Sequence, residues 1–476
     1  MVERKSWNHA CHQWRRPLIV DAVLRLYDTA TREVRELAMR EPGRVGIYLC
    51  GPTVYAPPHL GHGRATLEYD VLARYLRWQG VEVRLVSNVT DIDDRIIERS
   101  QREQRPWDEI TERCERVWWK AMDGLGVTRP DDVPHATAYV DEIVSMIGQL
   151  VEIGRAYTTD DGVYLSVATV EDYGLLAHQS LDELVAGGGE REVYGAESKR
   201  DPGDFALWKL AKPGEPSWPS PWGEGRPGWH SECVVMSLDL LGEGFDLHAG
   251  GMDLRFPHHE NERAQAVALG KRFARHWMHN GFVTDAEGEK MSKSLGNVDN
   301  LLDLLERYDG RTYRLLLLQS HYRSPVQVGA ENLEAAQNAL AGLDAFAARS
   351  AGVGETSRGD ADAAVLDAFS AAMDDDLDTP TATALIFDTV RRANTALDQN
   401  DPAARPLVAA VREMTGAVGL ELRRTEEVPG DVLERVATID AARAARDFAT
   451  SDSIRAELQA EGWIVETTAG GTSVRR

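Results

Sequence analysis

The chain has 476 residues, and this length exceeds the size at which one hydrophobic core keeps growing, so we expect roughly two to four structural units. Its formal net charge of −24 argues against a general nucleic-acid coat, because nonspecific phosphate binding needs a cationic surface. No apolar run reaches the ~18 residues of a membrane helix, and residues 1–7 lack the apolar centre of a signal peptide, so we expect a cytoplasmic protein with no membrane partner.

The first 150 residues alternate strand-like runs with helical patterns. We predict strands at residues 45–50 and 83–86, and helices at residues 67–78 and 107–122. This order predicts a parallel sheet built from strand–helix–strand units. A stretch rich in glycine, proline and acidic residues, 186–225, then interrupts the pattern.

The second half of the chain continues the sheet and then becomes helical. Residues 245–248 and 277–283 are predicted strands, and residues 258–270 a helix. Three alanine- and leucine-rich periods then predict an antiparallel bundle with a flexible link at 352–360. These periods cover residues 330–346, 364–373 and 380–397. The last unit is predicted to contain one helix and a short hairpin-like end.

The predicted fold class is therefore α/β: a Rossmann-like parallel-sheet catalytic domain with an insertion, followed by a helical bundle and a small C-terminal domain. Ligands in such sheets collect at the carboxyl ends of the strands. The boundaries that we assign are residues 1–21 for an N-terminal extension, 22–147 for the first catalytic half, 148–224 for a connective insertion, 225–325 for the second catalytic half with its KMSKS loop, 326–425 for the bundle, and 431–476 for the C-terminal domain.

The tetrapeptide His59–His62 lies between a predicted strand and a predicted helix. Phosphate groups bind at such positions, because unpaired backbone N–H groups and the helix dipole attract anions. Gly61 lets the backbone approach a nucleotide closely, and the imidazoles of His59 and His62 can donate hydrogen bonds to phosphate oxygens. Alone, the two histidines are equally well explained as a helix cap or a surface pair.

The pentapeptide Lys290–Ser294 follows this turn after 227 intervening residues. Neighbouring glycines predict a mobile loop, in which Lys290 and Lys293 would neutralise the charge that develops on departing pyrophosphate. Most short lysine pairs are solvated basic turns. The two motifs in this order, with a sheet-like core between them, instead indicate an active site that forms adenylates from ATP.

A glycine turn, His248–Asp253, follows the strand predicted at 245–248. Gly250 and Gly251 allow an adenine ring to lie against the backbone, and Asp253 can accept hydrogen bonds from ribose hydroxyls. A glycine turn with an acidic residue is more often only a turn. Its position directly after a strand favours a role in ATP binding.

Four residues have the side chains of zinc ligands: Cys50, Cys233, His258 and Glu262. Two thiolates, an imidazole and a carboxylate suit a tetrahedral zinc ion. One helical face can present both His258 and Glu262, which are four positions apart, although His259 competes for the imidazole position. Four cysteines in so long a chain argue against a disulfide framework, and buried cysteines are often inert apolar filler.

The chain resembles the class I aminoacyl-tRNA synthetases, and the residues between the two motifs are similar to those of the cysteinyl family. The resemblance is nearly continuous from about residue 22 to 325, and it thins beyond 330. The segments that carry it are Tyr48–Tyr55, Asn88–Asp94, Asp204–Lys209, Gly225–Cys233 and Phe256–Glu262.

This resemblance implies an enzyme that joins L-cysteine to tRNA(Cys) with ATP, through cysteinyl-adenylate. We expect a monomer, although the sequence does not determine the oligomeric state. The resemblance also implies that the four ligand residues, with His258 rather than His259, bind one zinc ion. This ion would bind the thiolate of cysteine in preference to the hydroxyl of serine. A separate domain that removes wrongly attached amino acids is then unnecessary. Mg²⁺ is expected with ATP. Gly51 and Thr90 resemble family positions near the amino acid, and Trp229 resembles a wall of its pocket.

The chain departs from the family pattern in several places. Ala56 stands where an acidic residue is usual, and Ile439 and Val474 replace a usual arginine and tryptophan. Residues 431–476, which resemble the anticodon-binding domain, hold six Arg and no Lys against eight Asp or Glu. Charge therefore gives no support for RNA contact there, and anticodon reading stays open.

Two other functions fit parts of the sequence. A cysteine:glucosaminyl-inositol ligase of mycothiol synthesis would share the zinc site and both nucleotide motifs, but it lacks the anticodon-binding tail. A catalytically silent RNA- or protein-binding paralogue would explain Ala56 and the altered tail. Both nucleotide motifs and all four ligand residues are nevertheless present, which favours an enzyme.

Overall fold

The structure is a computed structural model of the chain, and it describes residues 24–180, 183, 198–284, 300–423, 429–468 and 471–475. The chain folds into two compact units. The first comprises Met1–Gln337, Ala363–Phe387 and Met414–Leu420, and the second Asn338–Asp362, Asp388–Glu413 and Glu421–Arg476. Among the described residues, we find no helix with the length and apolar character needed to cross a lipid bilayer.

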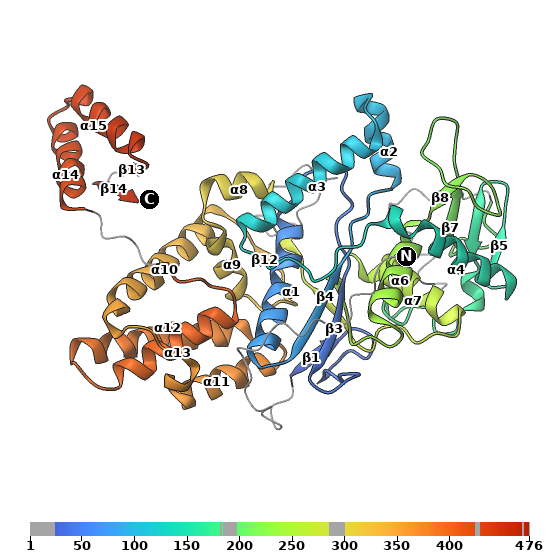
Figure 1. The fold of residues 1–476 in the computed structure, drawn as a ribbon, viewed down its shortest axis with the longest axis horizontal. Coiled ribbons are helices and arrows are strands. Elements are labelled where there is room, and N and C mark those ends of the chain that lie inside the picture. The colour runs from blue at the N-terminus through green and yellow to red at the C-terminus, as the bar shows by residue number, and fades with distance from the viewer. Residues whose placement is uncertain are drawn as a thin grey trace. The chain divides into compact units, whose positions relative to one another are not determined.

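A four-stranded parallel sheet lies at the centre of the first unit (Figure 1). Its strands, in spatial order, are β10 (Trp277–Asn280), β9 (Leu247–Gly251), β3 (Arg44–Leu49) and β4 (Glu82–Ser87). The chain passes from β3 to β4 on one side and returns later to β9 and β10 on the other. The strand order therefore reverses between β3 and β9, and the carboxyl ends of these two strands form the expected ligand site.

Helices connect and cover the first strands, as the alternating pattern predicts. They are α1 (Leu60–Trp78), α2 (Asp94–Glu103), α3 (Trp107–Gly124) and the short η1 (Ala136–Tyr139). Helix α1 begins seven residues before the predicted start at residue 67, because two imidazoles cap it. The ring of His59 accepts a hydrogen bond from the backbone N–H of His62, and Nδ1 of His62 accepts one from the backbone N–H of His59.

The insertion forms a separate antiparallel sheet beside α4 (Val140–Glu152). Its strands are β5 (Ala156–Thr158), β6 (Gly162–Leu165), β7 (Phe205–Leu210) and β8 (Gly225–Pro227), joined by the turn η2 (Val167–Thr169). Helix α6 (Trp229–Leu241) follows β8 and shares one apolar core with the insertion, in which Trp208 is fully buried. The insertion therefore returns the chain to the parallel sheet through α6.

The second catalytic half differs in detail from the predicted elements. The helix expected at 258–270 is α7 (Glu260–Ala268), and the two histidines lie in the preceding turn η3 (Arg255–His259). The strand expected at 277–283 is interrupted at Gly281, which leaves β10 and the short β11 (Val283–Thr284). A Cβ at Gly281 would lie 2.6 Å from the carbonyl oxygen of Ser324, so the chain passes another backbone too closely for a continuous strand.

Short elements complete the described part of the first unit. They are the hairpin β1 (Arg25–Asp28) and β2 (Glu33–Glu36), the helices α8 (Leu301–Arg307) and α9 (Gly310–Leu318), and β12 (Val326–Gln327), which pairs with β11.

Helices dominate the chain after residue 329. They are α10 (Ala330–Arg349), α11 (Ala363–Asp374), α12 (Thr379–Asp398) and α13 (Ala404–Ala417). The turn η5 (Ser350–Val353) overlaps the start of the predicted link, and the turn η6 (Arg358–Asp360) lies at its end. The sequence patterns predict three of these helices and miss α13. The α/β catalytic core with an antiparallel insertion and a following helical region confirms the predicted fold class.

The last segment contains two helices where one was expected. These are α14 (Gly430–Ala444) and α15 (Phe448–Ala460), followed by the antiparallel hairpin β13 (Ile464–Thr468) and β14 (Gly471–Arg475). The chain breaks at Arg446, which has a positive φ of 61°, and the Asp447 side chain then caps α15 by accepting from the N–H of Thr450 at 3.2 Å. Ile439 is fully buried in a core that also contains Trp463.

Candidate active site

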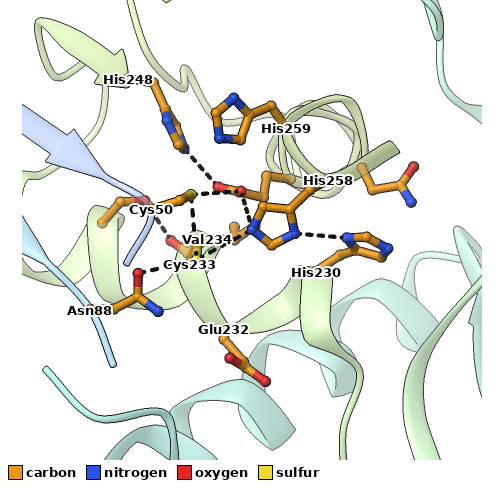
Figure 2. A network of polar contacts seen from close by, with 12 residues as sticks. Cys50, Asn88, His230, Glu232, Cys233, Val234, His248, His258 and His259 are labelled. Atoms are coloured by element: carbon orange, nitrogen blue, oxygen red, sulfur yellow. Dashed lines mark hydrogen bonds and ion pairs between the residues drawn. The ribbon is translucent and has the colours of Figure 1, made fainter. Parts of the chain in front are cut away.

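Four side chains from separate parts of the chain meet beyond the carboxyl end of β3 (Figure 2). Cys50 directly follows β3, Cys233 lies near the start of α6, His258 lies in the turn η3, and Glu262 lies in the first turn of α7. Cys233, His258 and Glu262 are buried, and Cys50 is partly exposed. The end of β3, the start of α6 and the junction of η3 with α7 therefore bring the four donors together at the edge of the sheet where ligands are expected.

The spacing of the four donor atoms suits a tetrahedral metal ion. The Sγ atoms of Cys50 and Cys233 are 3.7 Å apart, and Cys233 Sγ is 3.6 Å from His258 Nε2. Glu262 Oε1 is 3.4 Å from Cys50 Sγ and 3.0 Å from His258 Nε2. Ligand atoms around a tetrahedral ion with metal–sulfur bonds of about 2.3 Å and metal–nitrogen bonds of about 2.0 Å lie about 3.3–3.8 Å from one another. Three of the four distances fall in this range, and the fourth, between His258 and Glu262, is a hydrogen-bond length at 3.0 Å. The cluster could therefore hold a metal ion after a small separation of these two atoms.

A second grouping shares Cys50 and Glu262 and adds His248 and His259. His248 Nε2 lies 2.7 Å from Glu262 Oε2, which is a hydrogen-bond length and shorter than the edge between two ligands of one ion. The ring of His259 instead contacts His279, with 2.8 Å between Nδ1 and Nε2. His248 therefore orients Glu262, and the grouping with two sulfur atoms is the better donor set.

The imidazole of His258 is held on two sides. Its Nδ1 lies 3.0 Å from Nδ1 of His230, so its Nε2 faces the cluster. Its ring stacks on Trp229, with centroids 4.1 Å apart and an interplanar angle of 19°. Trp229, which the sequence predicts as a pocket wall, thus lies directly beside the cluster.

The charges within the cluster favour the anionic forms of Cys233 and Glu262, whereas burial and the neighbouring Cys233 raise the pKa of the Cys50 thiol well above its ordinary value. Burial raises the pKa of Cys233, but contacts with Cys50 and His258 outweigh burial and lower this pKa to about 6. Burial lowers the pKa of His258, and Glu262 and Cys233 raise it to about 9. Burial raises the pKa of Glu262, yet His248 and His258 hold it well below its ordinary value. A thiolate and a carboxylate side by side suit a bound cation.

The His59–His62 turn lies at the N-terminus of α1. The two rings stack, with centroids 3.7 Å apart, and Trp118 packs edge-on against His62 at 5.4 Å. A Cβ at Gly61 would lie 3.0 Å from the His59 ring, so glycine keeps this turn open beside the imidazoles. The turn combines a helix N-terminus with two fixed imidazoles, an arrangement that suits phosphate.

Lys290 and Lys293 lie outside the described residues. The described residues on either side of 285–299 contact the region of the His59–His62 turn. Asn300 forms an isolated backbone bridge with His59, and the N–H of Leu301 donates to the carbonyl of Pro58 at 3.1 Å. Before the segment, the Arg64 side chain donates to the carbonyl of Phe282 at 2.7 Å.

The glycine turn predicted for adenine and ribose lies at the end of β9. A Cβ at Gly250 would lie 2.7 Å from the ring of His259, and a Cβ at Gly251 would lie 2.5 Å from the Asp253 carboxylate. The hydroxyl of Tyr69, on α1, lies 3.1 Å from the Gly250 N–H and 2.8 Å from the Gly250 carbonyl. Tyr69 therefore connects α1, the helix that begins at the His59–His62 motif, to the glycine turn His248–Asp253.

Two buried residues beside the cluster, Asn88 and Glu232, lie within the motif segments but have no role predicted from the sequence. Asn88 contacts both Gly51 and Thr90, and Glu232 contacts Thr90. The sequence signal for Asn88 is a polar residue two positions after the strand predicted at 83–86. Glu232 has no such signal, because it lies inside a helical run.

Comparison with known proteins agrees with this geometry. Residues 36–338 match the family model described as the class I (C) tRNA synthetase catalytic domain, and residues 368–423 match the DALR domain. A cysteine–tRNA ligase of Streptomyces avermitilis is 44% identical over 94% of this chain and 98% of its own length. A cysteine–tRNA ligase of Thioalkalivibrio sulfidiphilus is 44% identical over 95% of this chain and its full length.

Solved structures share the fold at low sequence identity. The Mycobacterium tuberculosis methionyl-tRNA synthetase bound to methionyl-adenylate aligns with a TM-score of 0.60 at 16% identity, over 86% of this chain and 96% of that chain. The parallel sheet with its insertion is the fold of this structure, and the match to the class I family model shows that the chain is a class I aminoacyl-tRNA synthetase. Within that class, the chain belongs to the cysteinyl-tRNA synthetase family, as the resemblance predicts.

Proposed function

We propose that this protein is a cysteine–tRNA ligase, which activates L-cysteine with ATP and transfers the cysteinyl group to the 3′ end of tRNA(Cys). The observation that carries the proposal is the two-sulfur cluster at the same edge of the sheet as the His59–His62 turn. The two-sulfur cluster suits a thiol substrate, and the His59–His62 turn suits phosphate. We also propose that the chain acts as a monomer.

We infer that Cys50, Cys233, His258 and Glu262 hold one zinc ion. Two sulfur atoms, one nitrogen and one oxygen favour zinc over magnesium or calcium, which prefer oxygen ligands alone. When bound, zinc supplies a Lewis acid that favours the thiolate of cysteine over the hydroxyl of serine. Gly51, Thr90 and Trp229 form the rest of the amino-acid pocket in this proposal.

Activation then depends on position and charge. The cysteine carboxylate attacks the α-phosphorus of ATP, and the bond to pyrophosphate breaks. His59 and His62, with Lys290 and Lys293, stabilise the negative charge on departing pyrophosphate. Gly61 lies against the phosphates, while Gly250, Gly251 and Asp253 hold the adenosine. Mg²⁺ is proposed to accompany ATP.

Transfer needs no nucleophile from the protein. A terminal ribose hydroxyl of the tRNA attacks the activated carbonyl of cysteine, an ester bond forms, and AMP leaves with the electrons of the broken anhydride bond. The enzyme holds both reactants and excludes water from the mixed anhydride of cysteinyl-adenylate.

The proposal is tested by the cysteine-dependent exchange of labelled pyrophosphate into ATP, with serine as the matched control. We expect exchange with cysteine and essentially none with serine. Exchange should be followed by acceptor assays with tRNA(Cys) and with glucosaminyl-inositol. Transfer to tRNA(Cys) supports the proposal, and transfer to the sugar alone, or no exchange at all, contradicts it.

A further inference from the structure

A buried amide side chain, Asn88, links the metal cluster to two residues of the proposed cysteine pocket. Asn88 follows β4 and is 1% exposed. Its Oδ1 accepts a hydrogen bond from the backbone N–H of Gly51 at 2.9 Å, and its Nδ2 donates to Thr90 Oγ1 at 3.2 Å. Figure 2 shows Asn88 beside Cys233, whose Sγ lies 3.7 Å from Oδ1.

The orientation of this amide follows from its neighbours. The backbone N–H of Gly51 can only donate, so the Asn88 atom that faces it must be the oxygen. Nδ2 is then the atom that faces Thr90. The backbones of Gly51 and Asn88 also pass so closely that a Cβ at Gly51 would lie 1.6 Å from the backbone carbonyl oxygen of Asn88, so this approach requires glycine.

The amide in turn decides what the Thr90 hydroxyl can offer to a ligand. A hydroxyl has one proton and two lone pairs. The proton of Thr90 is donated to Glu232 Oε2 at 2.8 Å, and one lone pair accepts from Asn88. No third hydrogen-bond partner of this hydroxyl occurs in the part of the chain that the structure describes. The remaining lone pair can only accept a hydrogen bond.

We propose that Asn88 is a positioning residue that makes Thr90 an acceptor for the ammonium group of the amino-acid substrate. This inference rests on the proposed function, which puts cysteine between Thr90 and the metal cluster. Asn88 then acts at both ends of the substrate, through Cys233 and Gly51 on the thiol side and through Thr90 on the ammonium side. The pocket selects a thiol that carries an ammonium group over the same thiol without one.

The change Asn88→Asp tests the proposal, because it keeps the side-chain shape, replaces the Nδ2 donor by an acceptor and adds a negative charge. The Michaelis constant for cysteine in pyrophosphate exchange should rise at least about tenfold, while that for ATP changes less than about twofold. Inhibition by 3-mercaptopropionate, which has the thiol and carboxylate of cysteine but no ammonium group, should stay within about twofold. Equal weakening of cysteine and this analogue would overturn the proposal.

A second variant separates this role from a merely structural one. Thr90→Val removes the hydroxyl, so adding Asn88→Asp to it should raise the Michaelis constant for cysteine by less than about threefold. A full additional tenfold effect would contradict the proposed coupling.

The proposal stays testable if Asn88→Asp does not fold. Thr90→Val should then lose the preference for cysteine over 3-mercaptopropionate, and Thr90→Ser should keep it. A Thr90→Val protein that keeps the preference overturns the role of Thr90 as acceptor. Failure of the unaltered protein to catalyse exchange would instead contradict the proposed function itself.

Discussion

Cys50 Sγ and Cys233 Sγ lie 3.7 Å apart, although 183 positions separate the two residues in the chain. Cys50 ends the first strand of the parallel sheet, and Cys233 arrives only after the antiparallel insertion has folded and α6 has returned the chain. The two sulfur atoms can therefore come together only when both halves of the catalytic fold have formed.

Replacing one sulfur should empty the metal site. We expect Cys233→Ser to lose most of its zinc and to raise the Michaelis constant for cysteine at least about tenfold, because a hydroxyl is a poor zinc ligand. Cys114→Ser is the matched control, since Cys114 is also buried but lies in a different apolar cluster. Elemental analysis and pyrophosphate exchange measure both effects. Equal zinc in the two variants would remove Cys233 from the site.

Removing the ion should affect stability as well as activity. A chelator should abolish cysteine-dependent exchange and lower the thermal midpoint, because the buried Glu262 and Cys233 would then lose the charge of the metal ion and keep only the imidazole of His258 beside them. Adding zinc should restore both, and adding magnesium should restore neither. Activity that survives complete removal of metal would refute the proposed role of the ion.

Tyr69 should matter for the nucleotide and not for cysteine. Tyr69→Phe leaves the buried carbonyl and N–H of Gly250 without their hydroxyl partner, so the adenosine turn should loosen. We expect about a three- to tenfold higher Michaelis constant for ATP, with that for cysteine nearly unchanged.

Tyr75→Phe is the control for this prediction, because Tyr75 lies on the same helix and its hydroxyl contacts Asp374 instead. An equal rise in the ATP constant for both variants would show a general effect on α1. Steady-state pyrophosphate exchange at varied ATP distinguishes these outcomes.

Glu68 should make stability depend on pH. Burial raises the pKa of this carboxyl from 4.5 to about 7, and the opposing charge of Arg64 does not cancel the effect. The folded protein therefore binds the proton more tightly than the unfolded chain. The stabilising contribution is complete below pH 4.5 and is lost as the pH rises through about 7.

Glu68→Gln, which resembles the protonated carboxyl, should not lose this contribution. Relative to the variant, the wild-type protein should become less stable by about 3 kcal/mol between pH 4.5 and 8, since each pKa unit corresponds to about 1.4 kcal/mol. Urea midpoints of both proteins over this pH range measure the difference. Parallel curves would contradict the prediction.

Ile439 should support the C-terminal segment and not the chemistry. It is fully buried against Trp463, so Ile439→Ala should destabilise that segment by about 2–4 kcal/mol. Cysteine-dependent exchange should remain, because the residues proposed for activation lie in the other unit. Hydrogen exchange of residues 430–475 measures the first effect. A loss of pyrophosphate exchange would contradict the separation.

The family, the alternating elements and the residue types at the site follow from the sequence. His59–His62 and Lys290–Ser294 are local motifs, so the chemistry that they support can be inferred from the sequence without the tertiary structure. Strands and helices of the catalytic core likewise follow from short-range periodicity. Element starts are less predictable, because imidazoles can cap α1 and Asp447 can open a new helix after a break.

The contacts around the site depend on the tertiary structure. The competition between His258 and His259 is decided by the turn before α7, which directs His258 Nε2 to Cys233 and His259 Nδ1 to His279. Asn88 gains its partners only because the ends of β3 and β4 and the start of α6 lie at one place. Sequence determines which donors and acceptors the chain carries, and the fold decides which of them meet, because hydrogen bonds and metal coordination act only over a few ångströms.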